Sequence, residues 1–204
     1  MRPLTYLFII FIIFTVGAIW VLSFGDLTEC NLSLFKLNKK ILSTFFKYAS
    51  FWAEWPIILT SLLLSFYKWG KYAWMWVLSF AIEGVIIQTI KRFYNAPRPI
   101  ESFPTYAKQV DGILLAHYGS FPSGHTAAVV FGTGLLLWSL YSTHSKSRVF
   151  LSIVLFLGVI SAALSRVYLC QHHLQDIFAG GLIGATIFYL FSRINTKLFP
   201  ILSK

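Results

Sequence analysis

Three short segments of this chain carry side chains that suit the binding of a phosphate group. They are KRFYNAPRP at 91–99, PSGH at 122–125 and SRVYLCQHHLQD at 165–176. Together they supply fixed positive charges, a hydroxyl beside a glycine amide, and histidines beside a carboxylate. Ionisable groups gathered in this way in an otherwise apolar chain usually mark a functional site.

The first segment holds two cations, Lys91 and Arg98, on either side of a turn rich in Asn and Pro. Pro97 and Pro99 end the preceding helix and stiffen the loop. Two cations on a stiff loop can neutralise a doubly charged phosphate, and arginine can bind it through two parallel hydrogen bonds. The alternative is that both cations only contact lipid headgroups.

The second segment places Ser123, Gly124 and His125 just before an apolar run. Glycine lets the backbone approach a ligand closely, and the amides at a helix N-terminus attract anions. Ser123 can donate a further hydrogen bond, and His125 can donate a proton at the edge of the site. The alternative is a helix-capping turn with an incidental histidine.

The third segment spaces His172 and Asp176 four residues apart, which predicts that they share one helical face. A carboxylate bonded to one imidazole nitrogen fixes the tautomer and leaves the other nitrogen as a nucleophile. Arg166 lies upstream, and His173 points elsewhere on the same wheel, as a bystander would. The alternatives are a structural contact or two metal ligands, but no cluster of cysteines or carboxylates completes a metal site.

The composition is that of an integral membrane protein. Of 204 residues, 57% are hydrophobic and only 12% are charged, against about 25% charged in a typical soluble domain. The net charge of +10 is attributed to lipid headgroups rather than to nucleic acid, because Lys and Arg flank membrane helices. Two cysteines, Cys30 and Cys170, are too few for a disulfide framework.

The predicted fold is all-α, a bundle of six transmembrane helices that forms a single domain over residues 1–204. A membrane-spanning helix needs about 20 mostly apolar residues. Six segments meet this requirement or nearly do, and charged residues separate them. They are residues 4–24, 50–67, 72–90, 125–141, 149–166 and 174–194.

Residues 31–47 have a different pattern, with apolar and basic residues on opposite faces of a helical wheel. This pattern predicts an amphipathic helix that lies in the membrane interface. The alternative is a simple extension of the second span. The apolar face holds Leu34, Leu37, Ile41 and Phe45, and the basic face holds Lys36, Lys39, Lys40 and Lys47.

An even number of spans places both termini on one side of the membrane. We compare the number of Lys and Arg residues on the two sides, leaving out Lys91, Arg98 and Arg166 because they belong to the phosphate-binding segments. Eight of the remaining basic residues lie on the side of the termini and six on the other side. This bias predicts cytoplasmic termini and an external site. The short loops suit a bacterial enzyme, so the expected location is the bacterial inner membrane, with the site on its periplasmic side.

The three segments resemble the signature of the type 2 phosphatidic acid phosphatase superfamily. That signature reads Lys-x6-Arg-Pro, then Pro-Ser-Gly-His, then Ser-Arg-x5-His-x3-Asp. This chain matches every position at full spacing and in the same order. The match covers only about 25 residues, but three motifs in one small chain are highly specific.

The resemblance implies a phosphatase that needs neither a metal nor a cofactor. His172 would attack phosphorus and form a phosphohistidine, Asp176 would orient it, and His125 would protonate the leaving oxygen and then activate water. The remaining signature residues would hold the phosphoryl oxygens as charge develops. They are Lys91, Arg98, Ser123, Gly124 and Arg166.

The expected substrate is a lipid phosphate held in the bilayer. Candidates are a prenyl pyrophosphate such as undecaprenyl pyrophosphate, a phosphatidylglycerol phosphate or phosphatidate, and the phosphate of a lipid A. Two other functions stay open: a lipid phosphotransferase that uses the same site, and a lipid-phosphate transporter without catalysis. The sequence does not select among the substrates, nor does it give the oligomeric state.

One further charged residue, Glu83, falls inside the third predicted span, about two turns before Lys91. Charged groups at this depth usually face the interior of the bundle. One hypothesis is that Glu83 supports Lys91. The other is that it is a protonated, hydrogen-bonded structural residue.

Overall fold

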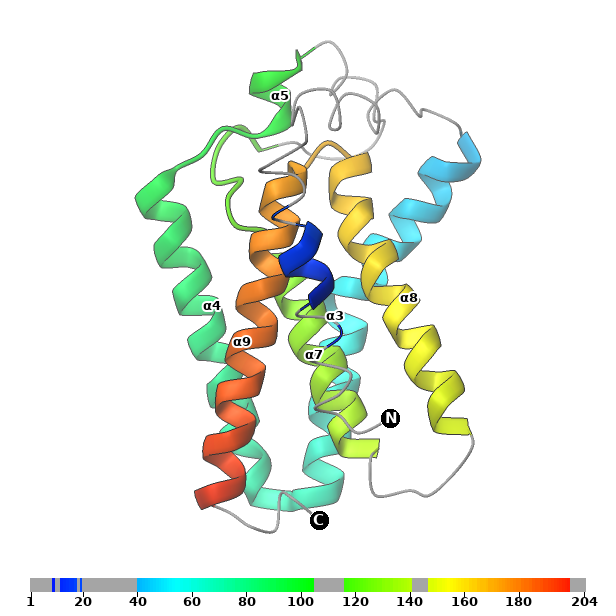
Figure 1. Ribbon diagram of the computed structural model, residues 1–204, viewed down its shortest axis with the longest axis vertical. Coiled ribbons are helices and arrows are strands. Elements are labelled where there is room, and N and C mark those ends of the chain that lie inside the picture. Colours follow the sequence, from blue (N-terminus) through cyan, green and yellow to red (C-terminus); the bar gives the residue numbers. More distant parts are fainter. Residues whose placement is uncertain are drawn as a thin grey trace.

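The computed structural model describes residues 9, 12–17, 19, 40–104, 116–140 and 147–198. Over these ranges the chain is helical, without a β-strand, and its long helices run side by side (Figure 1). The elements are α3 (Lys40–Trp69), η1 (Gly70–Ala73), α4 (Trp74–Tyr94), α5 (Pro99–Ser102), α7 (Gly124–Leu140), α8 (Ser147–Tyr168) and α9 (Leu174–Leu198). The prediction of an all-α fold is therefore confirmed for this part of the chain.

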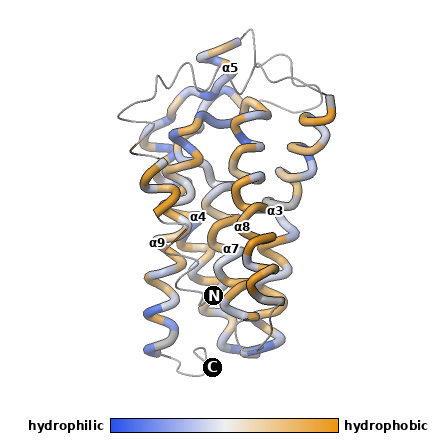
Figure 2. Tube along the Cα trace, turned by 45° about the vertical axis from the view of Figure 1, so that its right-hand side comes forward, coloured by the Kyte–Doolittle hydropathy of each residue, from blue (hydrophilic) through white to orange (hydrophobic). Residues whose placement is uncertain are grey.

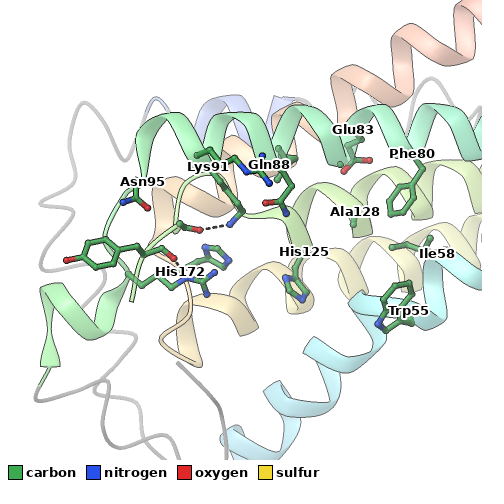
Figure 3. Close-up of a pocket in the computed structure, with 17 residues that line it drawn as sticks. Trp55, Ile58, Phe80, Glu83, Gln88, Lys91, Asn95, His125, Ala128 and His172 are labelled. Carbon is green, nitrogen blue, oxygen red and sulfur yellow. Dashed lines mark hydrogen bonds between the residues drawn. The ribbon is translucent and has the colours of Figure 1, made fainter. Parts of the chain in front are cut away.

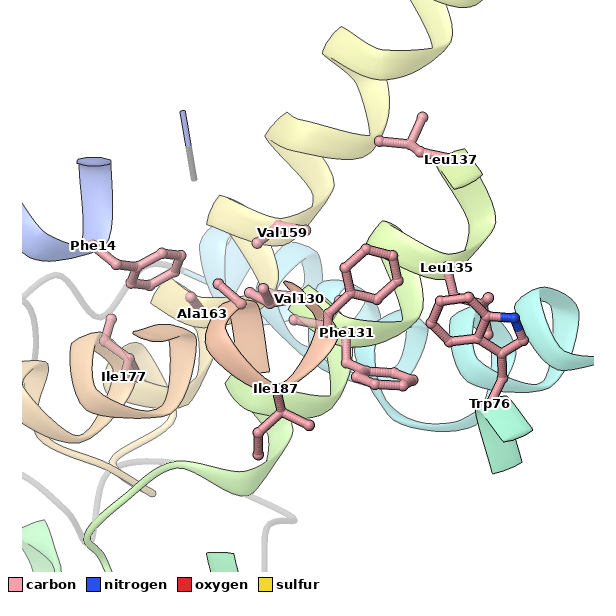
Figure 4. Close-up of a cluster of buried hydrophobic side chains, with 14 of the residues drawn as sticks. Phe14, Trp76, Val130, Phe131, Leu135, Leu137, Val159, Ala163, Ile177 and Ile187 are labelled. Atoms are coloured by element: carbon pink, nitrogen blue, oxygen red, sulfur yellow. The ribbon is translucent and has the colours of Figure 1, made fainter. Parts of the chain in front are cut away.

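Helix α7 lies at the centre of the bundle and packs against α3, α4, α8 and α9. Most of its residues are buried, and it is apolar on every side, as a helix surrounded by protein must be. Near its middle, Phe131 belongs to an aromatic cluster with Trp76 of α4 and Phe188 of α9. Figure 4 shows Phe131 and Trp76 among the buried side chains. Trp76 and Phe188 stack with ring centroids 5.4 Å apart.

Three stretches are long and apolar enough to cross a membrane: 41–94, 149–168 and 174–195. The first turns back on itself at η1, so it consists of two antiparallel arms, α3 and α4 (Figure 1). Helix α7 is a shorter apolar helix. These helices correspond to five of the six predicted spans. The predicted span 4–24 is described only in part, with residues 12–17 helical, so the count of six stays a prediction.

The outer faces of the bundle carry large apolar side chains, as contact with lipid requires. Leu59 and Leu63 of α3 are 56% and 60% exposed, and Phe150 and Leu157 of α8 are 72% and 56% exposed. Figure 2 shows the apolar residues along the middle of the helices and polar residues toward both ends. This distribution fits a bundle that sits in a bilayer with its ends in water.

The segment predicted as an interfacial helix, 31–47, lies partly outside the described residues. Its described part, 40–47, forms the first turns of α3, which agrees with the alternative that it extends the second span. Pro56 interrupts the hydrogen bonding of α3. The part of α3 that precedes it leans away from the axis of the bundle (Figure 1).

Helix α9 approaches α7 through two glycines, Gly180 and Gly184. A Cβ atom at Gly180 would collide with the carbonyl oxygen of Ser123, and one at Gly184 would collide with the carbonyl oxygen of Ala127. The spacing of four residues places both glycines on the face of α9 that meets the start of α7. These glycines therefore permit the close packing of α9 against α7.

We predict that Gly184→Ala destabilises the protein by about 1–3 kcal/mol, because an added methyl group must push apart two backbones. The thermal unfolding midpoint in detergent measures this effect. The matched control is Gly158→Ala in α8, where an added Cβ meets no atom within 4 Å. Alanine favours a helix over glycine by about 1 kcal/mol, so the control should unfold at the same temperature or higher. Equal losses in both variants would contradict this account.

Candidate active site

The three signature segments meet at one end of the bundle, around a cavity of about 750 Å³. Lys91 lies in the last turn of α4, and Arg98 lies in the loop that follows. Gly124 and His125 begin α7, and His172 precedes α9. All five of these residues line the cavity (Figure 3). The structure therefore brings together side chains that are up to 81 positions apart, from Lys91 to His172.

The other three predicted site residues lie directly behind this lining. They are Ser123, Arg166 and Asp176, and their exposed fractions are 0%, 4% and 1%. Each contacts the segments that carry the lining residues, as the following hydrogen bonds show. All eight predicted residues thus belong to one connected region.

Asp176 is the carboxylate behind His172. Its Oδ2 lies 3.5 Å from Nδ1 of His172 and accepts hydrogen bonds from the Ser120 hydroxyl at 2.5 Å and the His173 amide at 2.8 Å. These donors fix the carboxylate and point it at the imidazole. A neutral His172 that keeps its proton on Nδ1, toward Asp176, has its lone pair on Nε2, where a nucleophile needs it.

Burial lowers the pKa of His172 from its ordinary value to about 4, although Asp176 opposes the shift. The nearby Lys91 and Arg98 charges lower it further. The imidazole is therefore neutral at pH 7 and able to attack. Cys170, two residues earlier, is no competitor, because burial raises the pKa of its thiol to about 12 and keeps it protonated.

The prediction that His172 and Asp176 share a helical face is wrong in detail. Helix α9 begins at Leu174, so His172 lies in the loop before it. The contact forms because Asp176, in the first turn of α9, reaches back over the residue that precedes the helix, as in a capping box. His173 is not a bystander: its amide donates to Asp176, and its ring Nδ1 lies 3.5 Å from the same oxygen.

Ser123 caps α7 in this structure. Its hydroxyl accepts hydrogen bonds from the Thr126 hydroxyl at 3.0 Å and the Thr126 amide at 3.4 Å, and its own amide donates to the carbonyl of Asp176 at 2.9 Å. This is the capping turn considered as an alternative. Because the Ser123 oxygen acts as acceptor in both bonds, its own proton can still be donated to another group.

Lys91 and Arg98 are held by backbone carbonyls of two loops, the one before α7 and the one between α8 and α9. Lys91 Nζ donates to Gly119 at 2.6 Å, and Arg98 donates to Tyr118 through Nε at 3.1 Å and to Gln171 through Nη1 at 3.3 Å. Burial lowers the pKa of Arg98 and the Asp176 charge opposes this, but arginine stays charged at neutral pH. Both cations are thus fixed at the mouth of the cavity.

Arg166 connects the site to α3. Its guanidinium donates to the Ser50 hydroxyl of α3 and to the side-chain oxygen of Gln171. Its carbonyl accepts the amides of Gln171 and His172, each at 3.0 Å. Sequence reasoning missed Ser50, Gln171 and Ser120, since none of them forms a recognisable pattern with the residues that they contact.

His125 faces the same cavity as His172 (Figure 3). The three fixed cations, Lys91, Arg98 and Arg166, act electrostatically on it. A phosphate in the cavity would thus lie among two imidazoles and several cations. Within the part of the chain that the structure describes, no group of three or more His, Cys, Asp or Glu residues could hold a metal ion.

Comparison with known proteins agrees with this geometry. Residues 72–200, which include every predicted site residue, match the sequence profile of the PAP2 superfamily. The chain belongs to the PAP2 superfamily. It is 30% identical over 203 residues to an undecaprenyl-diphosphatase of Sulfolobus acidocaldarius, covering 94% of this chain and 92% of that one.

A plant relative, lipid phosphate phosphatase 2 of Arabidopsis thaliana, is 35% identical over 136 residues, which are 54% of this chain and 46% of the relative. The chain therefore spans about half of that protein. Two crystal structures share the fold. The phosphatidylglycerolphosphate phosphatase of Bacillus subtilis has a TM-score of 0.68 at 18% identity, with 97% of each chain covered. LpxE of Aquifex aeolicus has a TM-score of 0.63 at 22% identity, with 84% and 97% covered.

We predict that Ser120→Ala lowers kcat about tenfold, because Asp176 loses one of its donors and holds the His172 imidazole less firmly. Steady-state phosphate release from a lipid phosphate measures this. The control is Ser61→Ala in α3, which also removes a fully buried hydroxyl but one that bonds only to the Ile58 carbonyl of its own helix. Equal kcat values in Ser120→Ala and wild type would contradict the role of Ser120.

The low pKa of His172 also predicts a loss of stability in acid. The unfolded chain, with an ordinary histidine pKa of about 6.5, binds more protons than the folded chain between pH 6.5 and 4, so stability falls as the pH is lowered through this range. At pH 5 the loss is about 2 kcal/mol. Thermal unfolding at pH 7 and pH 5 should show a smaller loss in His172→Asn than in wild type. An identical loss would mean that the folded imidazole titrates normally.

Proposed function

We propose that this protein is an integral membrane phosphatase that removes the terminal phosphate of a lipid through a phosphohistidine on His172. Membership of the PAP2 superfamily supports phosphatase chemistry, and the names of the relatives support a lipid phosphate as the substrate. The observation that carries the proposal is the arrangement of His172 and His125 on one cavity, with Asp176 behind His172.

The proposed reaction has two steps. Nε2 of His172 attacks phosphorus, the bond between phosphorus and the lipid oxygen breaks, and His125 gives that oxygen a proton. His125 then takes a proton from water, whose oxygen attacks phosphorus and releases His172. Asp176 stabilises the positive charge that the imidazole carries while it is phosphorylated.

The phosphoryl oxygens gain charge as each transition state forms, and fixed donors stabilise them. Lys91, Arg98 and Arg166 would supply the positive charge that a metal ion supplies in other phosphatases. The Gly124 amide at the start of α7 adds a donor where a helix N-terminus favours an anion. The Ser123 hydroxyl would turn its proton toward the phosphate while it still caps the helix.

The lipid would stay in the bilayer while its phosphate enters from the helix ends. The bias of basic residues toward the termini supports an external, periplasmic site in a bacterial inner membrane. Lys68 and Lys71, at the turn between α3 and α4, lie at the opposite end of the bundle from Lys91, which is consistent with this orientation. The candidate substrates are undecaprenyl pyrophosphate, phosphatidylglycerol phosphate, phosphatidate and lipid A.

The test is phosphate release by the purified protein from a panel of these lipids. We expect His172→Ala to lose activity by about a thousandfold or more, because no other group can take over the attack on phosphorus. His117→Ala is the control, since its exposed imidazole pairs with Glu101 and lies outside the cavity. Full activity in His172→Ala would overturn the mechanism.

The same assay distinguishes the remaining alternatives. A chelator should leave the rate unchanged, whereas a loss that a divalent cation restores would show that a metal takes part. Analysis of the products by mass spectrometry separates transfer to water from transfer to another lipid, the outcome expected of a phosphotransferase. A protein that binds lipid phosphates but never breaks the phosphate bond would be a transporter.

A further inference from the structure

One face of α4 lines the cavity and changes in chemistry along its length. Lys91 stands at the outer end, Gln88 lies about one turn below it, and Glu83 lies about 12 Å below it along the helix axis. Figure 3 shows Gln88 and Glu83 between the phosphate end of the cavity and the side chain of Phe80. The cavity therefore has a polar section below its phosphate end, formed by the buried Glu83 and the exposed Gln88.

Glu83 is a buried carboxyl group with an oxygen that lacks a partner. Its side chain is 2% exposed, and its Oε2 makes no hydrogen bond within the described part of the chain. The Lys91 ammonium donates to the Gly119 carbonyl, and the described part of the chain has no hydrogen bond or ion pair between Lys91 and Glu83. An unpaired polar atom at such a position is costly unless a ligand completes its hydrogen bonding.

The far end of the cavity is apolar. Ile58 of α3 and Phe80 of α4 line it beside Trp55 (Figure 3). From the mouth inward, the lining of the cavity thus changes in three steps. It begins with cations, continues with the amide and carboxyl groups of Gln88 and Glu83, and ends with apolar side chains. A ligand that matches this order has a phosphate, then a linker that carries oxygen atoms, then apolar chains.

The geometry points to Glu83 and Gln88 as the residues that select lipids with an oxygen-bearing linker, that is, acylated glycerol or sugar phosphates rather than prenyl diphosphates. The Gln88 amide and a protonated Glu83 carboxyl can each donate a hydrogen bond to an ester carbonyl, and Glu83 can also accept from a hydroxyl or amide. A prenyl diphosphate carries a second phosphate and then hydrocarbon, so it has no ester carbonyl, hydroxyl or amide for Glu83. This inference rests on the proposed function and chooses between its substrate classes.

The physical basis is an asymmetry in specificity. A site built to hydrogen-bond a polar group discriminates strongly against a ligand without it, because the polar groups of the site are then buried without partners. The discrimination is weaker in the other direction, where an apolar pocket meets an additional polar atom. The buried Glu83 carboxyl in an otherwise apolar section of the wall therefore has more effect on substrate choice than the wall itself, and Gln88 adds a second polar contact nearer the mouth.

The experiment measures kcat/KM of the purified protein in mixed micelles for dioleoyl phosphatidate and for farnesyl diphosphate. We expect wild type to prefer phosphatidate. Glu83→Leu and Gln88→Leu should each lower kcat/KM for phosphatidate about tenfold or more while leaving that for farnesyl diphosphate unchanged or higher. Glu83→Gln should keep most of the preference, because an amide also forms hydrogen bonds.

The matched control is Thr89→Val, which removes a polar group from α4 outside the cavity, where the hydroxyl bonds to the Val85 carbonyl. It should not alter the ratio of the two substrates. Inhibition by inorganic phosphate reports on the outer end of the cavity and should be the same in all variants. If Glu83→Leu fails to fold, Gln88→Leu and Glu83→Gln still test the proposal.

The outcomes separate this inference from the proposed function. If wild type releases phosphate but prefers farnesyl diphosphate, or if the leucine variants lower both substrates equally, the assignment of Glu83 and Gln88 is wrong and the phosphatase proposal stands. If wild type releases phosphate from neither lipid nor from the other members of the panel, both proposals fail together.

Discussion

The buried carboxylate of Asp176 holds the site together. Its Oδ2 accepts hydrogen bonds from the Ser120 hydroxyl and the His173 amide and lies 3.5 Å from Nδ1 of His172. The backbone carbonyl of the same residue accepts the Ser123 amide. A carboxylate at this depth is stable only with such compensation. A single residue therefore fixes the loop before α7, the start of α7 and the start of α9 relative to one another.

The packing of the bundle makes this contact possible. Asp176 can reach the Ser123 segment only if α9 lies almost against the backbone of α7, and Gly180, one turn later, provides that approach. Glycine is unfavourable within a helix by about 1 kcal/mol relative to alanine. Its presence here is explained by geometry, because any side chain would move the Asp176 carboxylate away from the donors that stabilise it.

Much of the fold and of the site could be predicted from the sequence, because both depend on local patterns. Apolar runs locate the helices that the structure describes, and the motif spacing correctly brings His125 and His172 to one cavity. Contacts that arise only from tertiary structure have no local sequence pattern that could predict them. Ser50 accepts a hydrogen bond from Arg166, which is 116 positions away. The Ser120 hydroxyl donates to Asp176 of α9, which is 56 positions away. The helical-wheel argument failed for His173 because it placed residues 172–176 in one helix. In the structure, α9 begins only at Leu174.

In the proposed mechanism, the charges around the site meet two chemical requirements together. Lys91 and Arg98 would attract a phosphate, and the same charges help to keep the His172 imidazole unprotonated, so its lone pair would be present before a substrate arrives. A bound phosphate dianion offsets these cations. Positive charge on the imidazole, which bond formation to phosphorus creates, then becomes less costly, and Asp176 stabilises it from the other side. In this mechanism the cations would prepare the nucleophile in the free protein, and the substrate would offset the cost that their charges add to forming a positively charged imidazole.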